Sequence, residues 1–300
     1  MRLAGAIDIG GTAAKIGIVA ADGTIIRRAK IPTSPNGDPI PLVNSIASTL
    51  RPMLDATAAE RKSVSGVGVS VAGFLDGAHD AMIDNANLTA LRGFPLRRAL
   101  EERLALDCRL EVDSNAAVVA EYRHGAGRGA RRLLSVTVGT GLGGGVMIGG
   151  ELLRFNGECA GDLGHIILDP TGRRCTCGVQ GCFEAMVCSA ALSERAGGRV
   201  IRDVIGGARQ GEQSGIDALA ATGWWLGLGL ASLSPIFAPE TIVVGGGIGA
   251  AGEFLMEPTR ASYRAHATTE VRERVQIVGS SFDGWEGMVG AASLLLDPLD

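Results

Sequence analysis

Residues 6–32 read AIDIGGTAAKIGIVAADGTIIRRAKIP, and residues 133–155 read LLSVTVGTGLGGGVMIGGELLRF. In each stretch a mostly apolar strand precedes a Gly-Thr bend, a second strand follows, and a short turn leads into a third strand. The turns are Asp-Gly at 22–23 and Gly-Gly at 149–150, and both dipeptides are typical of β-hairpins. One supersecondary unit present twice predicts two α/β domains of the same architecture that face each other across a cleft.

The two Gly-Thr bends, at 11–12 and 139–140, can present backbone N–H groups and a hydroxyl with few side chains in the way. Such a surface suits the close approach of a phosphate chain. Asp8 ends the first strand, where a buried carboxylate needs a cation or hydrogen-bond donors, and a magnesium–phosphate unit would supply them. Together these features predict a nucleotide site, although one glycine hairpin alone is more often a plain turn.

A third glycine cluster, at 245–247, follows the strand-like residues TIVV and precedes the helix-forming residues 250–255. A base or ribose can lie against a backbone of this kind. The spacing is not G-x-G-x-x-G, so a dinucleotide site is not indicated. A plain strand-to-helix turn explains the cluster equally well.

Asp113 follows the strand-like residues CRLEV and precedes a helix that begins AAVVAEY. Ser114 and Asn115 are good N-cap residues, which would leave Asp113 at the carboxyl end of the strand, where α/β sheets bind ligands. A carboxylate there can accept the proton of a substrate hydroxyl during phosphoryl transfer. The alternative is that Asp113 only caps the helix.

Residues 164–182, GHIILDPTGRRCTCGVQGC, contain one histidine and three cysteines. One imidazole and three thiolates make a closed tetrahedral site for a structural Zn²⁺ ion. A disulfide is disfavoured, because Cys175 and Cys177 are too close to pair easily and nothing else suggests secretion. The predicted zinc ligands are His165, Cys175, Cys177 and Cys182.

Two carboxylates flank this cluster, Asp162 and Glu184. Side chains held beside a metal are well placed to bind the hydroxyls of a polyol, although either acid alone could be a solvated surface group. Asn87, in a loop after Gly73, could bind sugar hydroxyls too. Loop asparagines are more often turn formers.

The composition fits a soluble α/β protein of two domains: 300 residues, 45 glycines and a net charge of −4 with the signs interspersed. No basic stripe indicates nucleic acid as a partner. The N-terminal MRLAGAIDIGG has no apolar signal region, and residues 226–239 are too short and too interrupted by Gly and Pro to span a bilayer. We therefore expect a cytoplasmic protein without membrane contact.

Taken together, these motifs resemble those of the ROK family. The resemblance runs from DIGGT at 8–12 through VAGFLDG, VDSNA, GTGLGGG, GDLGH, CTCGVQGCFE and IVVGGGIG to GMVGAASL at 287–294. The Gly-His and CxCGxxGC cluster is the most specific part, because other actin-like sugar kinases lack it. The resemblance implies a two-domain actin-like ATPase fold of the ribonuclease H-like type. We expect a small domain over 1–115, with helix 286–300 packed on it, and a large domain over 116–285 that contains the zinc loop.

The resemblance also implies an ATP- and Mg²⁺-dependent hexose kinase. It favours a homodimer as the oligomeric state. Asp113 would be the base that takes the proton of the sugar's primary hydroxyl. His165 would bind zinc through one ring nitrogen and the sugar through the other. The other implied sugar contacts are Gly73, Asn87, Asp162 and Glu184; those to the phosphates are Asp8, Gly10, Gly11, Thr12, Thr140 and Gly141; and Gly246 and Gly247 would lie near the adenosine.

Three positions depart from the family pattern. Val112 stands where the family usually has Asn, Asp162 where it usually has Glu, and Ala13 where it often has Lys, with Lys15 further on. The expected base, Asp113, is present, so phosphoryl transfer should still be possible. The first two changes fall on sugar contacts and weaken an assignment to glucose.

A kinase that converts glucose to glucose 6-phosphate is therefore the leading hypothesis. Fructose, an amino sugar such as N-acetylmannosamine or N-acetylglucosamine, and a cyclitol are alternative acceptors. A sugar-sensing repressor of the same family is disfavoured, since no helix-turn-helix module precedes the first phosphate loop. The zinc loop and Asp113 also argue against a non-catalytic actin-like scaffold.

Overall fold

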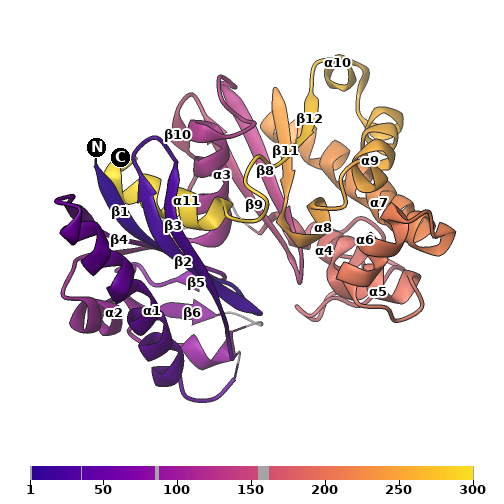
Figure 1. The fold of residues 1–300 in the computed structure, drawn as a ribbon. Helices are drawn as coiled ribbons and strands as arrows, with labels where there is room; N and C mark the ends of the chain where they lie inside the picture. The colour runs from indigo at the N-terminus through magenta and orange to yellow at the C-terminus, as the bar shows by residue number, and fades with distance from the viewer. Residues whose placement is uncertain (1, 35, 85–87, 155–161, 300) are drawn as a thin grey trace. The chain divides into compact units, whose positions relative to one another are not determined.

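The computed structural model describes residues 2–34, 36–84, 88–154 and 162–299. It divides the chain into two compact α/β units (Figure 1). The sequence-based boundary at 115 falls inside helix α3 (Asp113–His124), which stays whole within the first unit. The first unit comprises Met1–Gly125, Glu151–Gly161 and Trp285–Asp300, and the second comprises Ala126–Gly150 and Asp162–Gly284.

The first unit is built on a five-stranded sheet of order β3-β2-β1-β4-β7. Strands β1, β2 and β3 form the antiparallel meander expected from the opening sequence, and β4 and β7 run parallel to β1. Asp22-Gly23 makes the second turn, with Gly23 at a φ of +83° that favours glycine. The strands are β1 (Leu3–Ile9), β2 (Ala13–Ala20), β3 (Ile25–Pro32), β4 (Val64–Val71) and β7 (Cys108–Val112).

Alternation along the strands gives this sheet two apolar faces. Leu3 and Ile7 of β1 belong to the larger core, which α1 (Ile40–Ala59) and α2 (Leu96–Leu104) complete. Ala4 and Ala6 point the other way and pack with α11 (Glu286–Leu296). The short hairpin of β5 (Phe74–Leu75) and β6 (Met82–Asp84) and the 3₁₀ turn η1 (Thr89–Leu91) complete the unit.

Helix α11 joins the end of the chain to the sheet at its beginning, and it packs on α3, β4 and β1 (Figure 1). Three arginine side chains donate hydrogen bonds to carbonyl oxygens in its last turns, which complements the negative end of the helix dipole. These bonds are Arg123 to Ser293 (2.7 Å), Arg109 to Leu294 (3.3 Å) and Arg2 to Leu296 (2.7 Å).

The second unit repeats the topology, with the order β9-β8-β11-β12 among the strands that lie within its bounds. Strand β9 is antiparallel to β8, and β11 is parallel to β8 and β12. The sequence repeat therefore predicted the repeated sheet correctly. The strands are β8 (Arg132–Val138), β9 (Leu142–Ile148), β11 (Thr241–Gly245) and β12 (Gln276–Gly279). The short strand β10 (Glu151–Leu152) follows β9 in the chain and belongs to the first unit.

Helix α7 (Gln213–Phe237) is the one described helix that is long and apolar enough to cross a membrane by length and composition. It is longer than the sequence suggested, because it begins at Gln213 and continues through Pro235. However, 56% of its apolar window is buried within the protein. A Cβ at Gly227 would lie 2.3 Å from the carbonyl oxygen of Thr259 in α9 (Glu253–His266). Glycine thus lets the two helices pack closely, and α7 is a core helix of the second unit.

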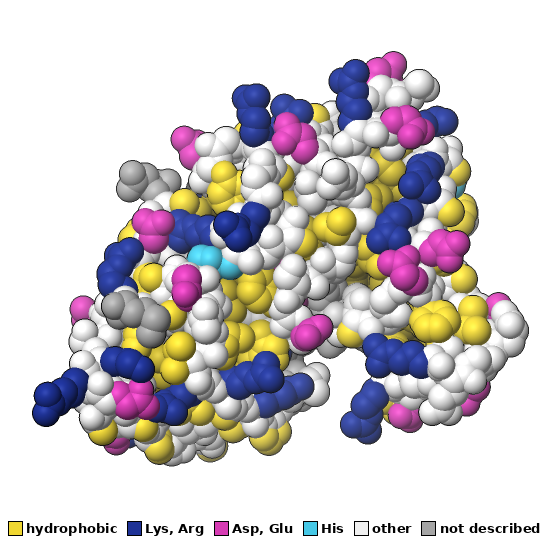
Figure 2. Space-filling view, turned by 45° about the horizontal axis from the view of Figure 1, so that its top comes forward, with side chains coloured by type: hydrophobic (Ala, Val, Ile, Leu, Met, Phe, Trp, Pro, Cys, Tyr) yellow, Lys and Arg dark blue, Asp and Glu magenta, His cyan; other side chains and the backbone are white. Residues whose placement is uncertain are grey.

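The remaining helices of the second unit are short. They are η2 (Leu163–His165), α4 (Phe183–Val187), α5 (Ser189–Arg195), α6 (Ile201–Arg209), α8 (Gly246–Gly249) and α10 (Thr269–Arg272). On the face drawn in Figure 2, basic side chains are interspersed with acidic ones. This distribution agrees with the mixed charges along the sequence.

Gly290→Ala is expected to destabilise the protein. A Cβ at 290 would lie 1.7 Å from the carbonyl oxygen of Ala116, so α11 and α3 would have to separate, at a cost of about 1–3 kcal/mol or more. Urea unfolding followed by circular dichroism should show a lower midpoint. Gly206→Ala is the matched control, because this helical glycine has open space around its Cβ position and alanine favours a helix. Equal midpoints for the two variants would contradict the close packing.

Candidate functional site

A row of polar residues crosses the sheet of the first unit near the carboxyl ends of its parallel strands. The Cα partners run from β3 through β2, β1 and β4 to β7, and side chains paired in this way lie on the same face. In the α/β class this edge of a sheet is where ligands bind. The row consists of Lys30, Lys15, Asp8, Ser70 and Glu111.

Asp8 is buried at the centre of this row, with 8% of its surface exposed. Its Oδ2 accepts a hydrogen bond from Lys15 Nζ (2.9 Å), and its Oδ1 accepts one from the Ser70 hydroxyl (3.0 Å). A Cβ at Gly287, in the first turn of α11, would lie 2.6 Å from Oδ1. The sequence predicted that this carboxylate needs a cation or donors, and the protein supplies both.

The bend that follows Asp8 is fixed by backbone hydrogen bonds. The N–H of Gly10 donates to the carbonyl of Ala13 (3.1 Å), and Thr33 donates to the carbonyls of Gly10 and Thr12. Thr12 is exposed and Gly11 is partly exposed, so the bend leaves a hydroxyl and backbone groups accessible for a phosphate chain.

Asp113 is the first residue of α3, and Val112 occupies the N-cap position. The expectation that Ser114 and Asn115 cap this helix was wrong, because both lie inside it. Asn115 instead donates from Nδ2 to Glu111 (2.9 Å), and the backbone N–H of Ser114 donates to Asp113 Oδ1 (2.7 Å). Asp113 keeps the position predicted for it, at the carboxyl end of β7.

Burial and the nearby carboxylate of Asp8 raise the pKa of Asp113 to about 7, against the opposing effects of the Ser114 N–H and the Lys15 ammonium group. A carboxylate that changes protonation near neutral pH suits a general base, because it can accept a proton in the reaction and release it afterwards. Asp113 must be deprotonated to act as a base, so enzyme activity should fall as the pH drops below about 7.

Glu111 organises the turn that carries Asp113, and the sequence did not reveal it. This carboxylate is 2% exposed and makes a two-pronged ion pair with Arg154 (3.0 and 2.5 Å). Its Oε1 also accepts a hydrogen bond from the N–H of Val112 (2.9 Å). An acid within an apolar strand was the only sign of this role in the sequence. Its partner, Arg154, lies 43 residues away and could not be identified from spacing.

Gly73 lies in the turn between β4 and β5, with a φ of +112° that favours glycine, and it is partly exposed. Asn87, the other sugar contact implied in this part of the chain, lies outside the described residues.

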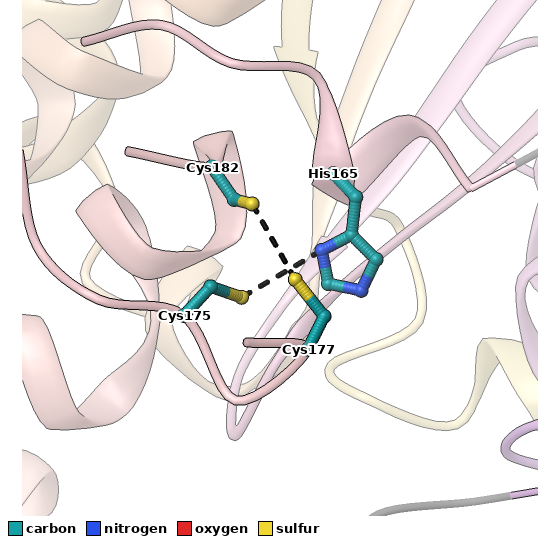
Figure 3. Close-up of side chains that lie close together, drawn as sticks. All are labelled: His165, Cys175, Cys177 and Cys182. Carbon is teal, nitrogen blue, oxygen red and sulfur yellow. Dashed lines mark hydrogen bonds between the residues drawn. The ribbon is translucent and has the colours of Figure 1, made fainter. Parts of the chain in front are cut away.

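In the second unit, His165, Cys175, Cys177 and Cys182 point toward one another (Figure 3). One ligand atom from each lies within 4.8 Å of all the others. Nδ1 of His165 is 3.7 Å from the sulfur of Cys175, and the sulfurs of Cys177 and Cys182 are 3.6 Å apart. The loop thus brings together all four ligands predicted from the sequence.

The 3.7 Å and 3.6 Å separations fit a tetrahedral zinc ion. With Zn–S near 2.3 Å and Zn–N near 2.0 Å, tetrahedral geometry places two sulfurs about 3.8 Å apart and a nitrogen and a sulfur about 3.6 Å apart. The cysteines are free of disulfides. Burial raises the pKa of the Cys182 thiol to about 12, so this sulfur needs a neighbouring cation to act as a thiolate. With four protein ligands the ion would be structural.

Asp162 lies against the other ring nitrogen of His165, with Oδ2 3.3 Å from Nε2. A carboxylate in this position orients the imidazole and favours the tautomer that leaves Nδ1 free for a metal. The Asp162 side chain is 41% exposed, so it can also receive a ligand. Burial raises the pKa of this carboxyl, although His165 opposes the change.

Glu184 links the metal loop to the second Gly-Thr bend. Its Oε2 accepts a hydrogen bond from the N–H of Leu142 (2.9 Å), and a Cβ at Gly141 would lie 2.4 Å from the same oxygen. Its Oε1 lies 3.7 Å from the sulfur of Cys175. Thr140 is exposed at the tip of the bend. The sequence suggested Glu184 and the Gly-Thr bend as separate features, but it did not indicate that they are in contact.

The third glycine cluster follows β11 as predicted. Gly246 has a φ of +82°, and a Cβ there would lie 2.5 Å from the carbonyl oxygen of Val138 in β8. Gly247 has open space at its Cβ position. The first glycine is therefore required by packing, whereas the second leaves room for a ligand to lie against the backbone.

The ROK family model matches residues 4–297. The chain belongs to the ROK family. It is 33% identical to a glucokinase of Streptomyces coelicolor over 99% of both chains, and 31% identical to an N-acetylmannosamine kinase of Escherichia coli over 97% of both. A crystal structure of a ROK family glucokinase from Streptomyces griseus, in complex with glucose and AMPPNP, matches with a TM-score of 0.85 and 33% identity over 97% of this chain and 98% of that one. The family and the actin-like fold predicted from the motifs are confirmed.

Cys177→Ser is expected to lower the zinc content from one ion per chain, because a hydroxyl is a much poorer zinc ligand than a thiolate. Elemental analysis after gel filtration in zinc-free buffer measures this directly. Cys108→Ser is the control: Cys108 is buried in the first unit, far in sequence from the cluster. Full zinc content in Cys177→Ser would remove this cysteine from the site.

Proposed function

We propose that this ROK chain is an ATP-dependent hexose kinase, with glucose as the first candidate acceptor and glucose 6-phosphate as the product. The observation that carries the proposal is Asp113, a carboxylate at the carboxyl end of β7 whose pKa is raised to about 7. The glucokinase relatives, similar over their full length, support the same reaction.

In the proposed reaction, Asp113 accepts the proton of the sugar's primary hydroxyl as the hydroxyl oxygen attacks the γ-phosphorus of ATP. An oxygen–phosphorus bond forms to the sugar, and the bond from the γ-phosphorus to the bridging oxygen of ADP breaks. The proton stays on Asp113 until it is released to solvent. Mg²⁺, when bound with ATP, would neutralise charge on the phosphates.

The remaining residues position the two substrates. The bends at 10–12 and 139–141 offer backbone N–H groups to the phosphates, and Gly246 and Gly247 would lie against the adenosine. A zinc ion in the cluster of His165 and three cysteines would keep Asp162, His165 and Glu184 in place for the sugar hydroxyls. In this proposal rate enhancement comes mainly from positioning.

The choice of sugar depends on few contacts. Val112 is 4% exposed and belongs to the apolar core of the first unit, so it offers no hydrogen bond to a ligand. Asp162 is shorter by one methylene than the family's usual glutamate. N-Acetylmannosamine and N-acetylglucosamine, fructose or a cyclitol are therefore the alternative acceptors. We also infer a cytoplasmic homodimer, for which family membership is the support.

A panel of sugars in a coupled assay of ATP consumption tests the proposal. Glucose or one of the alternative sugars should stimulate ATP consumption, and Asp113→Asn should lower that rate by about 10²–10⁴-fold, because the general base is lost. Nucleotide binding, measured by calorimetry with AMPPNP, should remain in the variant. ATP consumption that no sugar stimulates, or near-normal turnover by Asp113→Asn, would refute the kinase assignment or the role of Asp113 respectively.

Asp162→Glu is expected to raise glucose affinity by a few-fold, because it restores the longer carboxylate at an exposed position. Val112→Asn should add to this effect, but burial of an amide at this core position should also lower stability. The Michaelis constants for glucose and N-acetylmannosamine measure the change in preference. Asp217→Glu, on the exposed surface of α7, is the control. An unchanged ratio of the two constants would exclude Asp162 from sugar selection.

A further inference from the structure

The second Gly-Thr bend, between β8 and β9, is held by hydrogen bonds from outside the hairpin as well as within it. The carbonyl oxygen of Gly139 accepts two bonds from Ser189, one from the backbone N–H and one from the hydroxyl, each 2.8 Å long. The N–H of Gly139 donates to the carbonyl of Gly141 (2.9 Å), and the N–H of Leu142 donates to Glu184 (2.9 Å). Ser189 is the first residue of α5 and lies 50 residues from Gly139 in the chain.

These bonds hold two of the three peptide groups in the bend. A trans peptide group is planar, so its carbonyl and its N–H point in opposite directions. The carbonyl of Gly139 and the N–H of Thr140 belong to one such group, and the carbonyl of Gly141 and the N–H of Leu142 belong to another. Ser189, bound on the carbonyl side of the first group, therefore sets the direction in which the Thr140 N–H points.

Two N–H groups of the bend remain available to a ligand. Those of Thr140 and Gly141 donate no hydrogen bond to any part of the chain that the structure describes. Thr140 is exposed and Gly141 is partly exposed. Successive backbone N–H groups in a turn form a site for anions. The bend is thus held by the groups that face the protein, while its two remaining donors are accessible.

We propose that Ser189 is a positioning residue of the nucleotide site, which rests on the proposed kinase function. With two donors on the carbonyl of Gly139, it orients the N–H of Thr140 toward a phosphate oxygen of the nucleotide. Serine suits this role because its N–H and its hydroxyl can both donate to one acceptor. Alanine at this position would keep only the N–H.

A serine that only stabilised the second unit would behave differently from a positioning serine. Loss of a structural hydrogen bond lowers the unfolding temperature but leaves nucleotide binding unchanged. Loss of a positioning bond lets the peptide group of Gly139 and Thr140 rotate, so the affinity for phosphate groups falls. The affinity for adenosine, which has no phosphate, stays the same. The ratio of the two affinities therefore distinguishes the roles.

The test compares Ser189→Ala with Ser189→Thr and with Ser193→Ala as the control. Ser193 lies on the same helix, and its hydroxyl donates to the carbonyl of Arg199 (2.8 Å), so its loss removes an equivalent bond that does not involve the bend. Calorimetry should show AMPPNP with Mg²⁺ binding about fivefold more weakly to Ser189→Ala, the effect of one hydrogen bond. Ser189→Thr, which keeps the hydroxyl, and Ser193→Ala should bind AMPPNP like the unchanged protein. All three variants should bind adenosine equally.

NMR of the backbone amides gives a second readout that does not depend on a variant remaining folded. AMPPNP should shift the amide resonance of Thr140 in the unchanged protein. Equal AMPPNP affinity in Ser189→Ala and the unchanged protein, an equal loss for adenosine, or a Thr140 resonance that bound AMPPNP leaves unshifted would overturn the role of Ser189. No AMPPNP binding by the unchanged protein would instead refute the nucleotide site itself, and with it the proposed kinase function.

Discussion

A buried carboxylate, Asp8, sets the main constraint on the first unit. Removing a carboxylate from water costs several kcal/mol unless charge and hydrogen bonds replace the solvent. The protein meets this cost with Lys15 from β2, Ser70 from β4 and close contact with the first turn of α11. Three strands and the last helix must therefore be in register before the carboxylate is satisfied. Burial, and after it the charge of Asp8, raise the pKa of Asp113.

The second unit also contains buried groups that need a cation, here thiols that are soft metal ligands. Cys175 and Cys182 are buried thiols that suit a metal, and Glu184 extends from the same loop to the N–H of Leu142. The absence of a Cβ at Gly141 makes room for that carboxylate. The metal loop and the Gly-Thr bend are thus one connected structure.

The features predicted correctly from the sequence are local ones. Period-two alternation and the turns at 22–23 and 149–150 define the repeated hairpins, and the four metal ligands lie within one short loop. The errors and omissions involve hydrogen-bond and ion-pair partners. The start of α3 was misjudged because Asn115 bonds to Glu111 instead of capping the helix. The pairs Glu111–Arg154 and Asp8–Lys15 depend on strand register and on chain return, which propensity and spacing do not encode.

Helix α11 has a consequence for how the chain is made. The sheet that it covers includes β1, which begins at Leu3, yet the helix itself ends at Leu296. The sheet is therefore completed only by residues far along the chain. Before α11 packs, the small apolar side chains of β1 have no cover on that face, and the Asp8 carboxylate lacks part of its surroundings. Contacts so distant in sequence slow folding. Strand β1 is therefore made long before the helix that covers it, and its apolar face stays uncovered until α11 has been synthesised.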